Sequence, residues 1–253
     1  MRKVTIALIV LILLISFIIY NNGNPKAIIS NLAKKGAIRS GDLVYAIHLF
    51  GFLPIGEAII KAERKEEYNG SKAYHLHAAV ESSKVFSKFF SGSATLDSYL
   101  DTKAFSPLLF KQKVAISGKP PAYKEVTYDQ KNGIMTLAGV KRQIPFGTQD
   151  PLSLIFNIRK MDFDTVKKIE ANINTNQKNY ILEGVVLQDT ILINKQTYHT
   201  ASIKANIKRR DKNNPYHRSS IDMVLLKEEA NLPILIKVFA SGVLINAKLV
   251  EIK

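Results

Sequence analysis

The sequence predicts a mainly β fold: a curved antiparallel sheet or incomplete barrel with one or two covering helices, preceded by a single transmembrane helix. Three observations carry the prediction. Apolar and polar residues alternate with a period of two in several stretches, which is typical of strands with one covered face. Turn-forming pairs such as Asn-Gly and Ser-Gly separate these stretches at short intervals, which favours hairpins and antiparallel pairing. One long apolar run stands at the N-terminus.

The first element is the apolar run from Val4 to Tyr20, which follows Arg2 and Lys3. Its 17 residues reach the short end of what spans a hydrocarbon core. The run lacks the small residues of a signal-peptide cleavage site, so we expect residues 1–23 to be an uncleaved signal anchor. The two basic residues place the N-terminus in the cytoplasm by the positive-inside tendency. The rest of the chain then lies on the far side of the membrane.

Residues 24–40 predict a juxtamembrane helix and linker. Asn24 and Pro25 are typical of an N-cap and a first helical position, apolar residues follow at helical spacing, and Gly36 supplies a C-cap. The period then changes to two, so we expect residues 41–253 to form one β-rich extracytoplasmic domain.

Strand alternation is clearest over residues 73–80, 168–173 and 198–207. Two helices are expected to interrupt the strands. An apolar stripe over residues 85–90 has helical spacing, and Asp150, followed by proline, is a strong N-cap. Capping explains this aspartate without chemistry; a catalytic loop at the same position is the alternative.

A curved sheet with a helical cover can enclose an apolar cavity. Residues that the alternation directs inward would line that cavity and contact a ligand. These residues are Tyr74, Leu76, Val80, Leu182, Ile203 and Ile207.

The formal net charge of +15 favours polyanionic partners, either nucleic acid or an anionic membrane surface. A solvated lysine-rich surface accounts for the same charge. The densest basic cluster has few interleaved aromatic residues, which argues against nucleic-acid binding and favours anionic lipid head groups at the cavity rim. The residues expected to make these contacts are Lys204, Lys208, Arg209 and Arg210.

His75 and His77 project from the same face of a predicted strand, about 7 Å apart. Two imidazoles at this spacing can share a metal if His199 or an acid such as Glu81 supplies a third ligand. A pair of solvent-facing histidines explains the same pattern, so we assign no metal site.

No catalytic residue or cofactor is assigned either. The chain has no cysteine, which excludes disulfides, thiolate zinc sites, thiol nucleophiles and lipid attachment through cysteine. Asp97 and Asp101 are interpreted as solvated acids and not as a hydrolase pair. Nucleophile-elbow, phosphate-loop and dinucleotide fingerprints are absent from the sequence.

Several segments, in order, carry a resemblance to a known family. The most specific is Ile144-Pro145-Phe146-Gly147-Thr148-Gln149-Asp150-Pro151-Leu152-Ser153, and the others lie at residues 43–45, 51–58, 97–101, 105–107, 124–129, 156–159, 231–234 and 242–245. Over about residues 41–251 the chain resembles a bacterial envelope family known as domain of unknown function family 3108. The resemblance implies an exported, envelope-facing, β-rich protein and no catalytic mechanism.

We therefore expect a single-pass protein of the bacterial inner membrane, with its C-terminal domain in the periplasm or outside. The leading functional hypothesis is non-enzymatic binding or handling of a lipid or lipid-linked glycan, with the membrane and envelope proteins as partners. A structural or protein-interaction module is the first alternative, and its interior would be filled by side chains. An envelope hydrolase is the second, and it would need a cleft with a convergent nucleophile and base.

Overall fold

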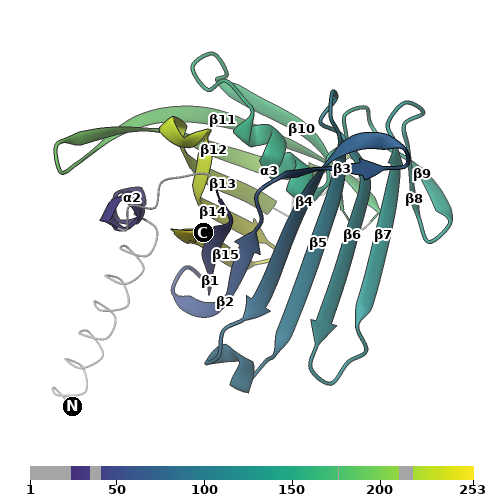
Figure 1. The fold of residues 1–253 in the computed structure, drawn as a ribbon, viewed down its shortest axis with the longest axis horizontal. Coiled ribbons are helices and arrows are strands. Elements are labelled where there is room, and N and C mark those ends of the chain that lie inside the picture. Colours follow the sequence, from purple (N-terminus) through teal and green to yellow (C-terminus); the bar gives the residue numbers. More distant parts are fainter. Residues whose placement is uncertain (1–23, 35–40, 176, 211–218) are drawn as a thin grey trace.

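The computed structural model describes residues 24–34, 41–175, 177–210 and 219–253, which form one long antiparallel sheet and two α-helices (Figure 1). The predicted mainly β, antiparallel architecture is confirmed. Neighbouring strands follow the order β10-β11-β12-β13-β14-β15-β1-β2-β4-β5-β6-β7-β8-β9, and β3 pairs with β4 beside this path. In chain order the elements are α2 (Pro25–Lys34), β1 (Leu43–Leu49), β2 (Leu53–Ile60), β3 (Arg64–Tyr68), β4 (Ser71–Ser82), η1 (Phe86–Lys88), β5 (Gly92–Asp101), β6 (Pro107–Ile116), β7 (Ala122–Asp129), β8 (Ile134–Leu137), β9 (Val140–Gln143), α3 (Pro151–Arg159), β10 (Lys168–Thr175), β11 (Lys178–Ile193), β12 (Gln196–Arg209), β13 (Ser219–Leu226), η2 (Lys227–Glu229), β14 (Leu232–Ala240) and β15 (Val243–Ile252).

The sheet curves so that its two halves face each other, with α3 between them (Figure 1). A parallel bridge and several side-chain hydrogen bonds tie the two ends of the sheet. Gln149, which follows β9, forms a parallel bridge with Ile173 of β10, where the Gln149 N–H donates to Asn172 O at 2.7 Å and the Asn174 N–H donates to Gln149 O at 2.9 Å. The sheet is therefore open along most of its edges and closed at this bridge, which we call the seam.

Asp150 fixes the start of α3 as an N-cap, which confirms the sequence prediction. Its Oδ1 accepts hydrogen bonds from the backbone N–H groups of Leu152 and Ser153 at 2.8 and 3.0 Å, and the Ser153 hydroxyl accepts one from the Asp150 N–H. Its Oδ2 accepts a hydrogen bond from the Ser98 hydroxyl of β5 at 2.6 Å. Burial raises the pKa of Asp150, and these hydrogen bonds oppose that rise.

The α3 helix packs into both halves of the sheet because its apolar side chains surround the helix. Leu154 and Ile158 belong to a core cluster with β10 to β14, and Leu152 and Phe156 belong to a second cluster with β4 and β5. The helix therefore lies inside the fold as a plug and not on its surface as a cover.

The helix expected after Asn24 is present as α2. Ile28, Ile29 and Leu32 are buried against residues such as Tyr198, so α2 packs on the folded domain near the ends of β11 and β12. Within the part of the chain that the structure describes, no helix combines the length and apolarity needed to cross a membrane. The expected signal anchor at residues 1–23 and the cap at Gly36 lie outside that part.

The helix expected over residues 85–90 is wrong in extent. The structure has only the single 3₁₀ turn η1 at Phe86–Lys88, and Val85 and Phe89 remain 71% and 86% exposed. A helix with an apolar stripe forms when another element buries that stripe. The connection from β4 to β5 leaves the stripe uncovered, so its helical spacing has no packing partner.

We predict that Asp150→Ala lowers the free energy of unfolding by about 2 kcal/mol or more, because it removes a helix cap and leaves the Ser98 hydroxyl without its acceptor. Asp150→Asn keeps an acceptor and should lose less. Asp162→Ala is the control, because the side chain of the exposed Asp162 makes only local turn contacts, with the Asp164 N–H and the Thr165 hydroxyl. Denaturant unfolding measures all three, and equal losses at positions 150 and 162 would contradict the role of the cap.

Candidate functional site

The inner face of the sheet beyond α3 carries partly exposed aliphatic side chains. Strands β4 to β7 continue well past α3 (Figure 1), and their register brings residues of the same face into rows. In one row Ala58 pairs with Val80, Val80 with Ala94 and Ala94 with Val114. We call this surface the inner apolar belt, and its half-buried members are Ile47, Ile60, Val80, Leu96, Val114 and Ala247.

A lysine lies on the same face as the inner apolar belt. Leu96 pairs with Gln112 and Gln112 with Lys124, so the Lys124 side chain is directed to the inner side of β7. Burial lowers the pKa of Lys124 from its usual value. An anionic group bound at the belt would therefore meet a partly desolvated cation.

The register places all six sequence-predicted cavity residues on the inner face, but side chains fill the space next to several of them. Leu182 and Ile203 are 0% and 1% exposed and pack in the cluster that contains Leu154 and Ile158 of α3. Leu76 is buried in the neighbouring cluster, where Tyr74 packs against Phe105 and Phe156 with ring centroids 5.9 and 5.6 Å apart. Val80 and Ile207 remain half-buried and open enough to meet a ligand.

The four basic residues expected at the rim do not share one face. Ile203 and Ile207 point inward, so Lys204 and Lys208 point outward, and both are exposed. Lys208 Nζ lies 2.6 Å from Glu183 Oε2, and Arg210 Nε donates to Asn172 Oδ1 at 3.0 Å. Arg209 alone has the inward parity of Ile207, because neighbouring residues of a strand face opposite sides.

Exposed aromatic residues gather where the β1–β2 and β4–β5 turns meet. The Ser83 N–H, at the start of the β4–β5 connection, donates to Ile55 O near the start of β2 at 2.9 Å. We call this surface the aromatic tip, and its members are Phe50, Phe52, Val85, Phe89 and Phe90, which are 39% to 86% exposed.

The aromatic tip has cations and a polar cleft beside it. Lys84 and Lys88 are exposed on the same β4–β5 connection. The cleft has a volume of about 430 Å³ and lies between this connection and the β6–β7 turn. Its lining includes Glu81, Ser93 and Lys119. A second cleft of about 570 Å³ lies at the C-terminal end of α3 and is lined in part by Phe156 and Arg159.

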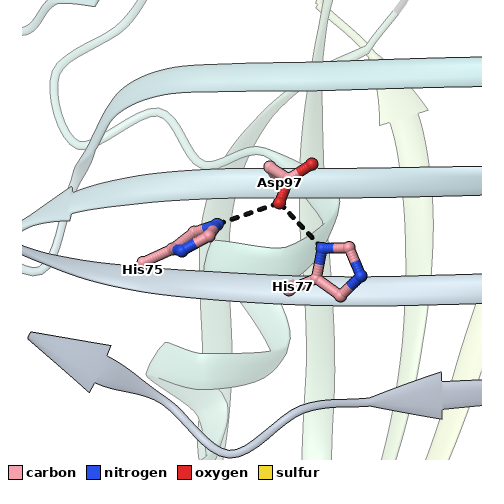
Figure 2. A group of neighbouring side chains, drawn as sticks. All are labelled: His75, His77 and Asp97. Atoms are coloured by element: carbon pink, nitrogen blue, oxygen red, sulfur yellow. Dashed lines mark hydrogen bonds and ion pairs between the residues drawn. The ribbon is translucent and has the colours of Figure 1, made fainter. Parts of the chain in front are cut away.

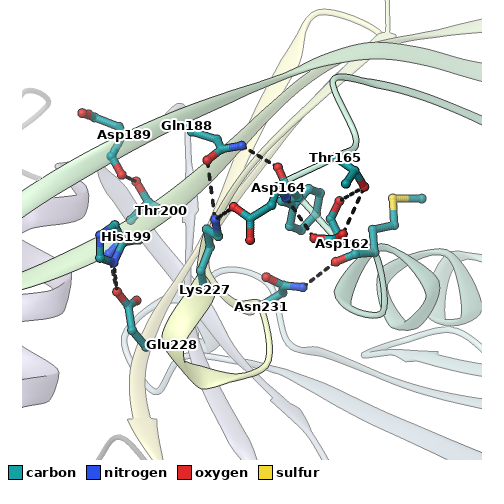
Figure 3. A network of polar contacts seen from close by, with 12 residues as sticks. Asp162, Asp164, Thr165, Gln188, Asp189, His199, Thr200, Lys227, Glu228 and Asn231 are labelled. Atoms are coloured by element: carbon teal, nitrogen blue, oxygen red, sulfur yellow. Dashed lines mark hydrogen bonds and ion pairs between the residues drawn. The ribbon is translucent and has the colours of Figure 1, made fainter.

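A polar network beside the second cleft fastens the connection between α3 and β10 to its neighbours (Figure 3). Lys227 Nζ contacts Asp164 Oδ1 at 2.5 Å, and this ion pair lowers the pKa of Asp164. His199 Nδ1 lies 2.6 Å from Glu228 Oε1, whereas the adjacent Thr200 hydroxyl donates to Asp189 O. The hydroxyl and the imidazole are thus engaged separately, unlike the nucleophile and base of a hydrolase.

Comparison with known proteins supports the fold and leaves the activity open. The family model described as "Protein of unknown function (DUF3108)" matches residues 44–243. The search of curated proteins found no match. A crystal structure of a beta-barrel-like protein of domain of unknown function DUF1849 from Brucella abortus is similar, with a TM-score of 0.57 and 12% sequence identity over 84% of this chain and 96% of that one. At this identity the similarity concerns the fold alone.

We predict that Leu182→Ala lowers the free energy of unfolding by about 2–5 kcal/mol, because a filled core cannot collapse around the lost methyl groups. Val80→Ala should cost less than about 1.5 kcal/mol, since Val80 is half-buried and loses fewer contacts. Urea unfolding of both variants measures the difference. Equal losses in the free energy of unfolding would show that the inner face is packed uniformly. That result would contradict the distinction between the core and the inner apolar belt.

Proposed function

This chain belongs to DUF3108, a family of proteins of unknown function, and we propose that it is a non-enzymatic, membrane-anchored cell-envelope protein that binds or handles a lipid or lipid-linked glycan. The observation that carries the proposal is the inner apolar belt. Aliphatic side chains that point into the concave side of a folded sheet and yet stay partly exposed are suited to an acyl chain.

Charge and polarity around the belt fit the other end of such a ligand. Lys124 supplies a cation on the inner face, where partial burial strengthens its attraction for a phosphate or carboxylate. The polar cleft at Glu81, Ser93 and Lys119 is separate from this site, because Glu81 and Ser93 alternate with Val80 and Ala94 and face the opposite side of the sheet. The aliphatic belt and Lys124 together favour an amphiphile over a purely apolar molecule.

The aromatic tip supports contact with a membrane surface. Exposed phenylalanines such as Phe89 insert favourably at a lipid interface, and flanking lysines such as Lys84 and Lys88 are attracted to anionic head groups. The net charge of +15 acts in the same direction. In the proposed topology residues 1–23 lie in the inner membrane, the N-terminus lies in the cytoplasm and the β-rich domain reaches the membrane from the periplasmic side.

We predict that lipid co-purifies with the full chain extracted in mild detergent and that native mass spectrometry detects it. Val80→Phe should reduce the bound fraction several-fold, because the added ring occupies space at the belt. Ala79→Phe is the matched control, since it adds an aromatic ring to the adjacent residue on the opposite face of β4. Lipid-free wild-type protein, or equal losses in both variants, would favour the structural module.

Membrane contact by the aromatic tip has its own optical test, because the chain contains no tryptophan. In the full chain reconstituted into anionic vesicles, the fluorescence of Phe89→Trp should shift to the blue and be quenched by brominated lipids. Phe146→Trp is the control: Phe146 is 85% exposed, in the segment that follows β9 at the other end of the sheet. Equal quenching at both positions, or at neither, would contradict insertion of the tip.

A further inference from the structure

Three potential metal ligands converge on the outer face of β4 and β5, on the side opposite the inner apolar belt (Figure 2). His75 and His77 lie on the same face of β4, and Asp97 of β5 is the registered partner of His77. Asp97 Oδ1 lies 2.9 Å from His75 Nε2 and 2.8 Å from His77 Nδ1. Among the residues that the structure describes, only this group brings three such ligand atoms within 4.8 Å of one another.

We infer that His75, His77 and Asp97 bind a first-row divalent transition metal ion, for which Zn²⁺ is the best-matched probe. Two imidazole nitrogens and one carboxylate oxygen are a ligand set that Zn²⁺ accepts with a fourth position left for water. Mg²⁺ and Ca²⁺ prefer sites built from oxygen atoms and are not favoured here. The inference is independent of the proposed function, because the ligands lie on the face that does not carry the belt.

The distances suit insertion of an ion between the three side chains. Zn–N and Zn–O bonds of about 2.0–2.2 Å in a tetrahedral site separate the ligand atoms by roughly 3.3 Å. The present separations from Asp97 Oδ1 are about half an ångström shorter, so small rotations of the side chains would admit the ion. The side chains of His75, His77 and Asp97 are 18%, 29% and 27% exposed, which leaves a path for the ion and for a solvent ligand.

The orientation of His75 is set by two further contacts. Its Nδ1 lies 3.1 Å from Glu66 Oε1 of β3, and its ring stacks on Tyr99 with centroids 4.4 Å apart and planes 5° from parallel. Metal-binding histidines commonly donate the second ring N–H to a carboxylate, which fixes the ring and its tautomer. Glu66 occupies the position of such an outer partner.

The hydrogen bonds of His75 also call for a cation. Both ring nitrogens face carboxylate oxygens, so a neutral ring that donates to Glu66 directs the lone pair of Nε2 at Asp97. A metal ion between Nε2 and Asp97 Oδ1 removes this opposition. Two cations are registered beside the cluster: Arg64 of β3 opposite His75, and Lys111 of β6 opposite Asp97, which is paired with Glu125 at 3.4 Å.

The test is a Zn²⁺ titration of the full chain, purified in detergent without a polyhistidine tag and followed by calorimetry. Wild-type protein should bind one Zn²⁺ per chain and not Mg²⁺. His77→Gln and Asp97→Asn should each weaken Zn²⁺ binding at least 10-fold. Glu66→Gln should weaken it by about 10-fold or more while keeping the 1:1 stoichiometry, as expected for an outer partner.

His199→Gln is the matched control, because His199 also contacts a carboxylate but has a single imidazole in its cluster. It should leave the affinity unchanged. Zn²⁺ should also raise the melting temperature of wild-type protein and of His199→Gln but not of His77→Gln, which separates binding from a folding defect. Absence of binding by wild-type protein, or the same affinity in His77→Gln as in His199→Gln, would overturn the inference. Lipid retention in His77→Gln should stay at the wild-type level, so the two proposals fail separately.

Discussion

The buried carboxylate of Asp150 is the interaction on which the rest of the architecture depends. It joins the start of α3 and the adjacent seam residue Gln149 to the hydroxyl of Ser98 in β5, which lies 52 residues earlier in the chain. A charged group without water is tolerated only when its oxygens are satisfied, and here both are. The cap therefore fixes where α3 lies along the strands. The position of α3 in turn decides which inward-facing side chains are buried and which stay partly exposed.

Much of the sheet could be predicted from the sequence because alternation reports the two faces of a strand directly. The stretch from Tyr74 to Val80 has the predicted polarity, and Asp150 caps the predicted helix. Which inward residues line open space could not be predicted, because that depends on where α3 lies. Leu182 and Val80 have the same inward pattern, yet only Leu182 meets the plug.

Two other features, the third candidate metal ligand and the faces of the basic residues, depend on strand pairing and on the alternation of side chains along a strand. The third ligand beside His75 and His77 is Asp97, which is brought there by strand register, and not His199 or Glu81. Asp101, four residues after Asp97, instead accepts hydrogen bonds from backbone N–H groups in its own turn. The basic residues Lys204, Lys208 and Arg210 alternate with the inward parity of Arg209, because consecutive residues of a strand face opposite sides. The register between neighbouring strands decides which of their residues lie side by side, and the sequence of a single strand does not specify that register.

The seam gives the fold a mechanical asymmetry. Along one side the two halves are joined by an unbroken series of paired strands, whereas along the other they meet through the two backbone hydrogen bonds at Gln149 and a few side-chain hydrogen bonds, such as that from Asn179 Nδ2 to Gln143 O. The seam alone therefore contributes less than a strand pair. Because α3 packs against both halves, moving the halves apart would also separate the helix from one of its two core clusters. The inner width of the fold is thus fixed by the helix together with the seam, and a wider opening requires both to give way.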